Sequence, residues 1–367
     1  MGAYEYLLAL ALILVFTKIF GLATAHVHLP QVVGALLAGI LLGPSGIGIL
    51  HETDFLVKTA EIGVIMLMFI AGIDTDINEL KHTGPAACLI AAIGVFVPII
   101  GCGGVYFLFF EDSFTYANII KASFVGIVFA ATSVSITVET LNEMGKLKTR
   151  VGATLLSAAI IDDIIGIVVL SVLSALGDSS VNPGIVVLKI LGFFVFAGIV
   201  GFIVYKLFKK ISINHGTSRR VAVWAMAFCF IMAYCAERFF GVADITGAYF
   251  AGVMLCNVTK MRQYVAKKVT AASYLVFSPV FFANIGLKTD LSGINSEIIV
   301  FAAVLAVMAV LTKIIGCGLG AKICRMSNHE SLVVGVGMVA RGEVALMVAQ
   351  KGLDSGNIDP KVFPAIV

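Results

Sequence analysis

Two adjacent aspartates, Asp162 and Asp163, lie near the middle of an apolar stretch that runs from about Val151 to Leu176. One Asp at the centre of a membrane-spanning helix costs roughly 2.5–3.5 kcal/mol. An adjacent pair costs more, because each carboxylate opposes the ionisation of the other. Neutral, hydrogen-bonded aspartates inside a helix bundle are the structural alternative, which is weaker for a pair than for one residue. The pair is therefore predicted to hold a monovalent cation or a proton within the membrane.

Lys313 is a second charge in an apolar run, near the middle of residues 294–323. It is too central to reach either membrane surface by extending its side chain, so we expect it to pair with a buried acid. Consecutive helical residues point about 100° apart, so one aspartate can face Lys313 while the other faces a water-filled path. We assign Asp162 to Lys313 and Asp163 to the path, although spacing alone also permits the reverse.

Polar residues interrupt two other apolar runs, at Thr132 and Ser133 in the first half and at Arg341 and Gly342 in the second. Both places suit locally unwound helices, whose free carbonyls and hydroxyls can bind a cation near the middle of the membrane. Thr132 and Ser133 are the predicted oxygen ligands of a Na+ ion at Asp163. Ordinary packing of hydroxyls between helices is an equal alternative.

Glu61 and Glu343 are further charges in apolar runs. An ion pair between Glu61 and Arg341 would tie two helices together, and a structural role is favoured over ion binding. A carboxylate that titrates near cytoplasmic pH binds either a proton or a cation. Competition for one such site gives exchange when access alternates between the two sides of the membrane. Lys313 can supply a second proton if the ion displaces its ion pair.

The composition is that of a membrane protein. Of 367 residues, 60% are hydrophobic and 13% are charged, and the mean hydropathy is +1.05. An average soluble domain carries about 25% charged residues. The seven cysteines form no metal-ligand or disulfide spacing and mostly lie in apolar runs, so we expect them to pack between helices. No cofactor, enzymatic activity or nucleic-acid partner is expected.

The apolar runs are long and do not alternate, so they are predicted to be helices that span the lipid bilayer. The predicted helices lie near residues 4–24, 28–50, 56–73, 84–110, 117–141, 151–177, 183–208, 218–239, 242–259, 267–287, 294–323 and 330–352. A thirteenth begins near Pro360, and the sequence stops within it. Alternate connections collect the Lys and Arg residues, Lys146 and Arg150 among them, so these connections face the cytoplasm and the N-terminus lies outside.

An internal repeat relates the two halves. Residues 33–39 resemble residues 246–252, and residues 73–77 resemble residues 287–291, at offsets of 213 and 214. This offset covers seven predicted helices, an odd number, so the halves have opposite orientations in the membrane. Inverted repeats of this kind are typical of secondary transporters. The predicted fold is therefore an all-α polytopic membrane protein of thirteen helices, arranged as six, one linker and six, with crossing broken helices.

Together these features resemble the monovalent cation:proton antiporter superfamily, in the branch of bacterial NapA-type and Kef-type transporters. The matching segments are Leu29–Gly34, Leu36–Gly46, Glu61–Val64, Ala71–Asp74, the pair Asp162–Asp163, Lys313 and Arg341–Glu343. The resemblance covers the whole chain, and its motifs are specific in combination.

The resemblance implies an electrogenic sodium/proton antiporter of the bacterial inner (plasma) membrane, in which lithium is a second candidate cation. It implies that Asp163 binds the ion and the proton while Asp162 pairs with Lys313. It also implies a homodimer with elevator-type alternating access. The interface domain would comprise residues 1–82 and 213–292, the moving core residues 83–180 and 293–367, and a linker helix residues 181–212.

Other functions stay open at this point. Kef-type potassium efflux systems usually carry Gln at the position of Asp162, which favours sodium exchange over gated potassium efflux. Potassium/proton exchange, or mixed sodium/potassium exchange of the spore-germination kind, is the main alternative. A channel would conduct without proton coupling, and a scaffold would transport nothing. An intramembrane aspartyl protease needs aspartates on two facing helices, whereas these are adjacent.

Overall fold

The computed structural model describes residues 4–26, 29, 31–74, 77–110, 113–133, 137, 141, 146, 149–176, 183–215, 218–256, 258–289, 291 and 295–367. These residues form helices and connections, and they contain no β-strand. Eight of the described helices are long and apolar enough to cross a membrane, and three shorter apolar helices accompany them. The chain is therefore a multi-pass membrane protein, as its composition predicts.

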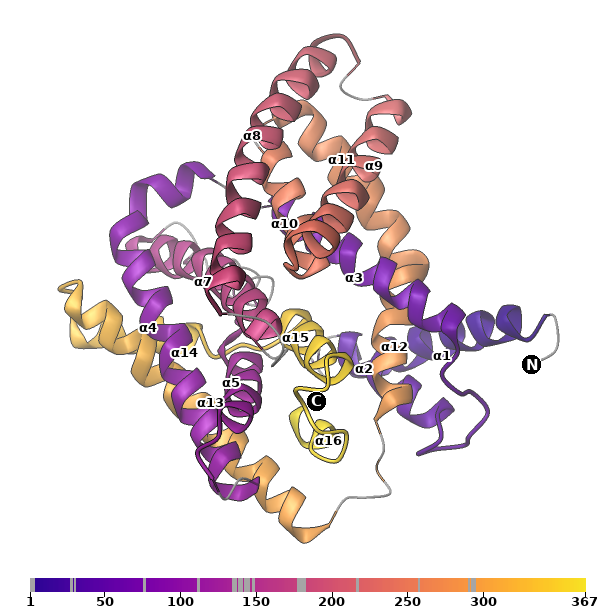
Figure 1. The fold of residues 1–367 in the computed structure, drawn as a ribbon, viewed down its shortest axis with the longest axis vertical. Helices are drawn as coiled ribbons and strands as arrows, with labels where there is room; N and C mark the ends of the chain where they lie inside the picture. Colours follow the sequence, from indigo (N-terminus) through magenta and orange to yellow (C-terminus); the bar gives the residue numbers. More distant parts are fainter. Residues whose placement is uncertain are drawn as a thin grey trace. The chain divides into compact units, whose positions relative to one another are not determined.

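The chain forms two compact units, and each unit takes helices from both halves of the sequence (Figure 1). The first unit comprises Met1–Thr75 and Leu188–Gly293. Its helices are α1 (Glu5–His26), α2 (Gln31–Leu42), α3 (Asp54–Asp74), most of α8 (Pro183–His215), α9 (Arg219–Cys235), α10 (Asp244–Leu255), α11 (Thr259–Ala272) and α12 (Ser278–Lys288). Two π-helical turns, η1 (Ala236–Phe240) and η2 (Ser273–Phe277), extend α9 and join α11 to α12.

The second unit comprises Asp76–Val187 and Ile294–Val367. Its helices are α4 (Ile77–Phe110), α5 (Tyr116–Ala130), α7 (Arg150–Leu176), α13 (Ser296–Ile323), α14 (Asn328–Gly337), α15 (Glu343–Asp354) and α16 (Phe363–Ile366). The predicted domain boundaries at 180/181 and 292/293 lie outside the described residues.

Two predicted spans are shorter than expected, for different reasons. The helix expected near residues 28–50 ends at Leu42, because Pro44 follows directly and disfavours continued helix. The chain then turns back, and Leu50 N–H donates to the Leu42 carbonyl at 2.8 Å. The helix expected near residues 117–141 ends at Ala130, and Ala131 is already extended, with φ −60° and ψ 136°. This second end coincides with the break predicted at Thr132.

The internal repeat reappears as helix packing in the first unit. A side chain on Gly39 of α2 would collide with the Ala283 carbonyl of α12, and one on Gly252 of α10 would collide with the Phe69 carbonyl of α3. Gly252 follows Gly39 by 213 residues, and Ala283 follows Phe69 by 214. The two close helix crossings are therefore equivalent, and both need the absence of a side chain, as is common where helices pack in lipid.

Replacing Gly39 by Val should destabilise the first unit, because the new side chain forces α2 away from α12. Overpacking of this kind costs about 1–3 kcal/mol. Melting temperature in detergent measures the loss. Gly198→Val is the matched control, because Gly198 lies in α8 with open space around its Cβ position. Equal melting temperatures for the two variants would show that this crossing does not require glycine.

The second unit carries a repeat of its own at a different offset. The sequence Ile-Ile-Gly-Cys-Gly occurs at residues 99–103 in α4 and again at residues 314–318 in α13, 215 positions later. Gly126 of α5 packs against the Ile99 carbonyl, and Gly335 of α14 packs against the Ile314 carbonyl. Helices α13 and α14 therefore pack on each other as α4 and α5 do. This repeat is a sequence signal that the 213-residue offset does not cover.

Candidate cation-binding site

The second unit brings Lys313 and Asp162 together. Lys313 Nζ of α13 lies 2.7 Å from Asp162 Oδ1 of α7, and both side chains are fully buried. Removing an ion from water costs several kcal/mol, and a buried pair repays this cost only when further hydrogen bonds satisfy both partners. The surroundings of each partner therefore decide what the pair can do.

Lys313 has three acceptors for its three N–H groups. Besides Asp162, its ammonium donates to the Gly94 carbonyl of α4 at 3.0 Å and to the Ala130 carbonyl at the end of α5. An ammonium group has three donors, so all of them are used. The carbonyl end of a helix also favours a positive charge. Four helices of the second unit thus meet at one ammonium group.

The aspartate pair is less completely satisfied than the lysine. Asp162 Oδ2 is buried and has no hydrogen-bond partner among the described residues. Asp163 is the next residue of α7 and is partly exposed, whereas Asp162 is buried. One carboxylate oxygen is thus held by Lys313, and the neighbouring carboxylate is more accessible. This arrangement leaves oxygen atoms available to a proton or a small cation.

Two helix breaks meet in the same unit. Helix α5 ends at Ala130, and α14 and α15 are separated by residues 338–342 (Figure 1). Ser133 N–H donates to the Ala340 carbonyl at 2.9 Å, and Thr132 Oγ1 donates to the Met338 carbonyl at 3.3 Å. Thr132 and Ser133 are both 1% exposed. The two interruptions predicted from sequence therefore lie side by side, directly after the carbonyl that holds Lys313.

Arg341 occupies the second break. Its Nη1 donates to the Val339 carbonyl at 2.7 Å and the Met338 carbonyl at 3.2 Å, and its Nη2 donates to the Ala309 carbonyl at 3.4 Å. The guanidinium thus satisfies carbonyls at the end of α14. Gly342 precedes α15. Glu343 is the first residue of that helix, and its side chain lies outside the described part of the chain.

Glu61 belongs to the first unit. It lies in α3 and forms an ion pair with Lys58 at 2.8 Å, with 46% of its side chain exposed. An exposed pair three residues apart on one helix contributes little to stability. The expected pair between Glu61 and Arg341 would join the two units, and it stays a prediction.

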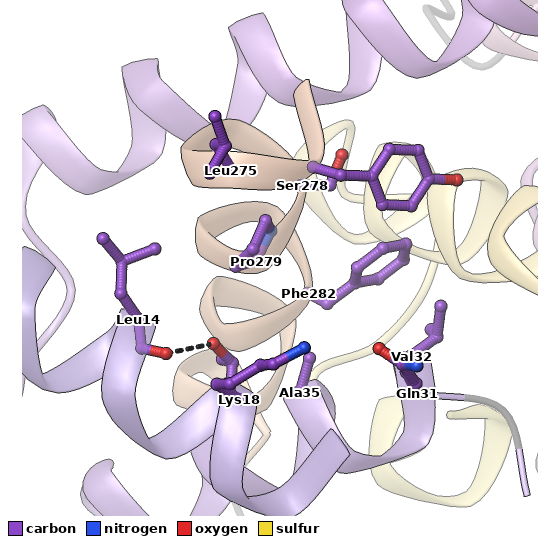
Figure 2. Close-up of a pocket in the computed structure, with 11 residues that line it drawn as sticks. Leu14, Lys18, Gln31, Val32, Ala35, Leu275, Ser278, Pro279 and Phe282 are labelled. Atoms are coloured by element: carbon purple, nitrogen blue, oxygen red, sulfur yellow. Dashed lines mark hydrogen bonds between the residues drawn. The ribbon is translucent and has the colours of Figure 1, made fainter. Parts of the chain in front are cut away.

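A pocket of about 660 Å³ lies elsewhere in the first unit, between α1, α2 and α12 (Figure 2). Its lining is mostly apolar, with Lys18 and Gln31 among the polar side chains. No residue predicted to bind ions lines it. Within the described residues, no three His, Cys, Asp or Glu side chains come together as a group able to hold a metal ion.

Comparison with known proteins gives a consistent picture. A family model described as "Sodium/hydrogen exchanger, transmembrane" matches residues 8–367. The Na(+)/H(+)-K(+) antiporter GerN of Bacillus cereus is 38% identical over 365 residues, which cover 99% of this chain and 92% of GerN. The Na(+)/H(+) antiporter of Enterococcus hirae is 35% identical, with 99% of this chain and 94% of the relative covered.

A solved structure extends this likeness to the fold. The sodium proton antiporter MjNhaP1 of Methanocaldococcus jannaschii superposes with a TM-score of 0.79 and 21% sequence identity. The alignment covers 100% of this chain and 93% of that structure. The match confirms the predicted all-helical membrane fold.

Proposed function

Because this chain belongs to the transmembrane sodium/hydrogen exchanger family, we propose that it exchanges a monovalent cation for protons, with Asp163 and Asp162 as the shared site. The observation that carries the proposal is the buried Lys313–Asp162 pair beside two helix breaks. A structural ion pair alone would not need an adjacent, more accessible carboxylate. Nor would it need a break in two helices at the same place.

Exchange follows from competition at this site. Asp163 takes up a proton or a cation, and Asp162 contributes the oxygen that Lys313 does not hold. Thr132 and Ser133 supply further oxygens from the broken backbone of the α5 end. A bound cation and a bound proton exclude each other, because both neutralise the same carboxylates. Alternating access then couples the inward movement of one to the outward movement of the other.

The moving part is proposed to be the second unit, which carries the site, while the first unit forms the contact within a homodimer. The division of the chain supports this assignment, since each unit combines equivalent segments of both halves. Inverted repeats of this kind allow one bundle to move against the other around a fixed site. The distribution of Lys and Arg supports an N-terminus outside the plasma membrane of a bacterial cell.

Sodium is the proposed cation, with lithium as a second substrate, and exchange is electrogenic because two aspartates and one lysine share the site. Potassium/proton or mixed exchange is the second candidate. The printed name of GerN includes potassium as well as sodium, and that relative is 38% identical to this chain.

Proteoliposomes with an imposed pH gradient test the proposal. Sodium should dissipate the gradient in wild-type vesicles, lithium should do so as well, and potassium should act weakly or not at all. A membrane potential should change the rate, since net charge moves. Potassium acting as strongly as sodium would establish mixed exchange instead. Current without proton coupling would indicate a channel, and no response to any cation would reject the antiporter proposal.

A further inference from the structure

The carbonyl of Gly94 is available to Lys313 for a reason written into α4. Pro98 lies inside this helix, four residues after Gly94. In a regular α-helix the N–H of residue 98 donates to the carbonyl of residue 94, but proline has no N–H. The Gly94 carbonyl therefore lacks its helical donor, and Lys313 Nζ donates to it at 3.0 Å instead.

The second carbonyl that holds Lys313 is also released from a helix. Helix α5 ends at Ala130, and the chain continues in an extended conformation. Both neutral acceptors of the ammonium are thus main-chain carbonyls at interruptions of the helical ladder. Such groups are costly to bury without a donor. Lys313 supplies that donor to both.

The repeat within the second unit shows what is special about α4. At the offset of 215 residues, Ala309 corresponds to Gly94, and Lys313 itself corresponds to Pro98. In α13 the ladder keeps an N–H at this place. The Ala309 carbonyl takes only a longer bond of 3.4 Å from Arg341. The missing N–H, and with it the 3.0 Å bond from a side chain, occurs only in the first copy.

We propose that Pro98 is a positioning residue for Lys313, which reserves the Gly94 carbonyl for the ammonium group. This inference rests on the proposed function, in which Lys313 loses its ion pair when a cation occupies the aspartates. Held by two carbonyls, the lysine keeps its place when Asp162 is neutralised. If the ammonium releases a proton, the amine still has two N–H groups for the two carbonyls. The lone pair then faces Asp162, so only that contact changes.

The positions around Gly94 fit this role. A side chain there would collide with Cys317 Sγ, and it would stand 3.7 Å from Asp162 Oδ1 and 3.8 Å from Lys313 Nζ. The absence of a side chain lets α13 approach closely enough for Lys313 to reach the carbonyl. Gly94 and Pro98 therefore act together, one by giving room and the other by freeing the acceptor.

A double-mutant cycle with Pro98→Ala and Lys313→Met tests the proposal through melting temperatures in detergent. Lys313→Met leaves the Gly94 carbonyl without a donor, and Pro98→Ala gives it a backbone N–H. We expect Pro98→Ala to raise the melting temperature by at least about 2 °C more in the Lys313→Met protein than in the wild type. Pro85→Ala, at the other proline inside α4, should have the same effect in both backgrounds. Additive effects for Pro98→Ala would overturn the proposal.

A transport measurement on the Lys313-containing protein adds a readout that a purely structural proline would not change. Pro98→Ala should displace the pH profile of sodium-driven proton movement by at least about half a pH unit, and Pro85→Ala should leave it unchanged. A profile that superimposes on the wild type would contradict the positioning role. The melting-temperature cycle does not depend on transport, so failure of the proposed function and failure of this inference are distinguishable.

Discussion

Asp163→Asn should abolish cation-driven proton movement, leaving only the leak of protein-free vesicles. The amide has the shape of the carboxylic acid but cannot exchange a proton or carry the charge that holds a cation. Asp162 cannot replace it, because Asp162 Oδ1 is engaged by Lys313 at 2.7 Å. Asp163 is also the more accessible of the two residues, so its side chain is the first that an entering ion meets.

Proton movement in proteoliposomes measures this loss, with sodium added to wild-type and variant vesicles at equal protein content. Asp54→Asn is the matched control, since Asp54 is an exposed carboxylate in the first turn of α3. It should exchange as the wild type does. Normal exchange by Asp163→Asn would show that the aspartate pair has a structural role only, and the site assignment would be wrong.

Lys313→Met should cause the largest loss of stability of any single substitution in the second unit. Removing one partner of a buried ion pair costs about 3–5 kcal/mol, because the other charge stays buried and uncompensated. Here the Gly94 and Ala130 carbonyls lose their donor as well. The loss should grow as the pH rises, since Asp162 in the variant avoids a buried charge only while it holds a proton.

Melting temperatures in detergent, taken over a range of pH, test this prediction. Adding Asp162→Asn to Lys313→Met should recover part of the stability and remove most of the pH dependence, because no unpaired charge remains. Lys58→Met is the control, as Lys58 belongs to an exposed pair that contributes little. If Lys313→Met melts at the wild-type temperature at every pH, the ion pair does not stabilise the fold.

The sequence by itself determined the class of protein and the identity of its unusual charges. Apolar runs of this length must be helices in lipid, because no other local structure satisfies their backbone there. Asp162, Asp163 and Lys313 stand out in such runs because buried charge is costly. The repeats at offsets of 213 and 215 residues also lie in the sequence. They predict the equivalent helix crossings that Gly39 and Gly252 make in the first unit.

Only the tertiary structure decided how these parts meet. Spacing allowed either aspartate to face Lys313, because the rotation of α7 depends on how its neighbours pack. Asp162 Oδ1 lies 2.7 Å from the lysine. The ends of α2 at Leu42 and α5 at Ala130 were also beyond apolar patterning, which continues past both. The carbonyls of Gly94 and Ala130 carry no side-chain signal. They become acceptors for Lys313 only when separate helices converge, because main-chain carbonyls look alike in every sequence.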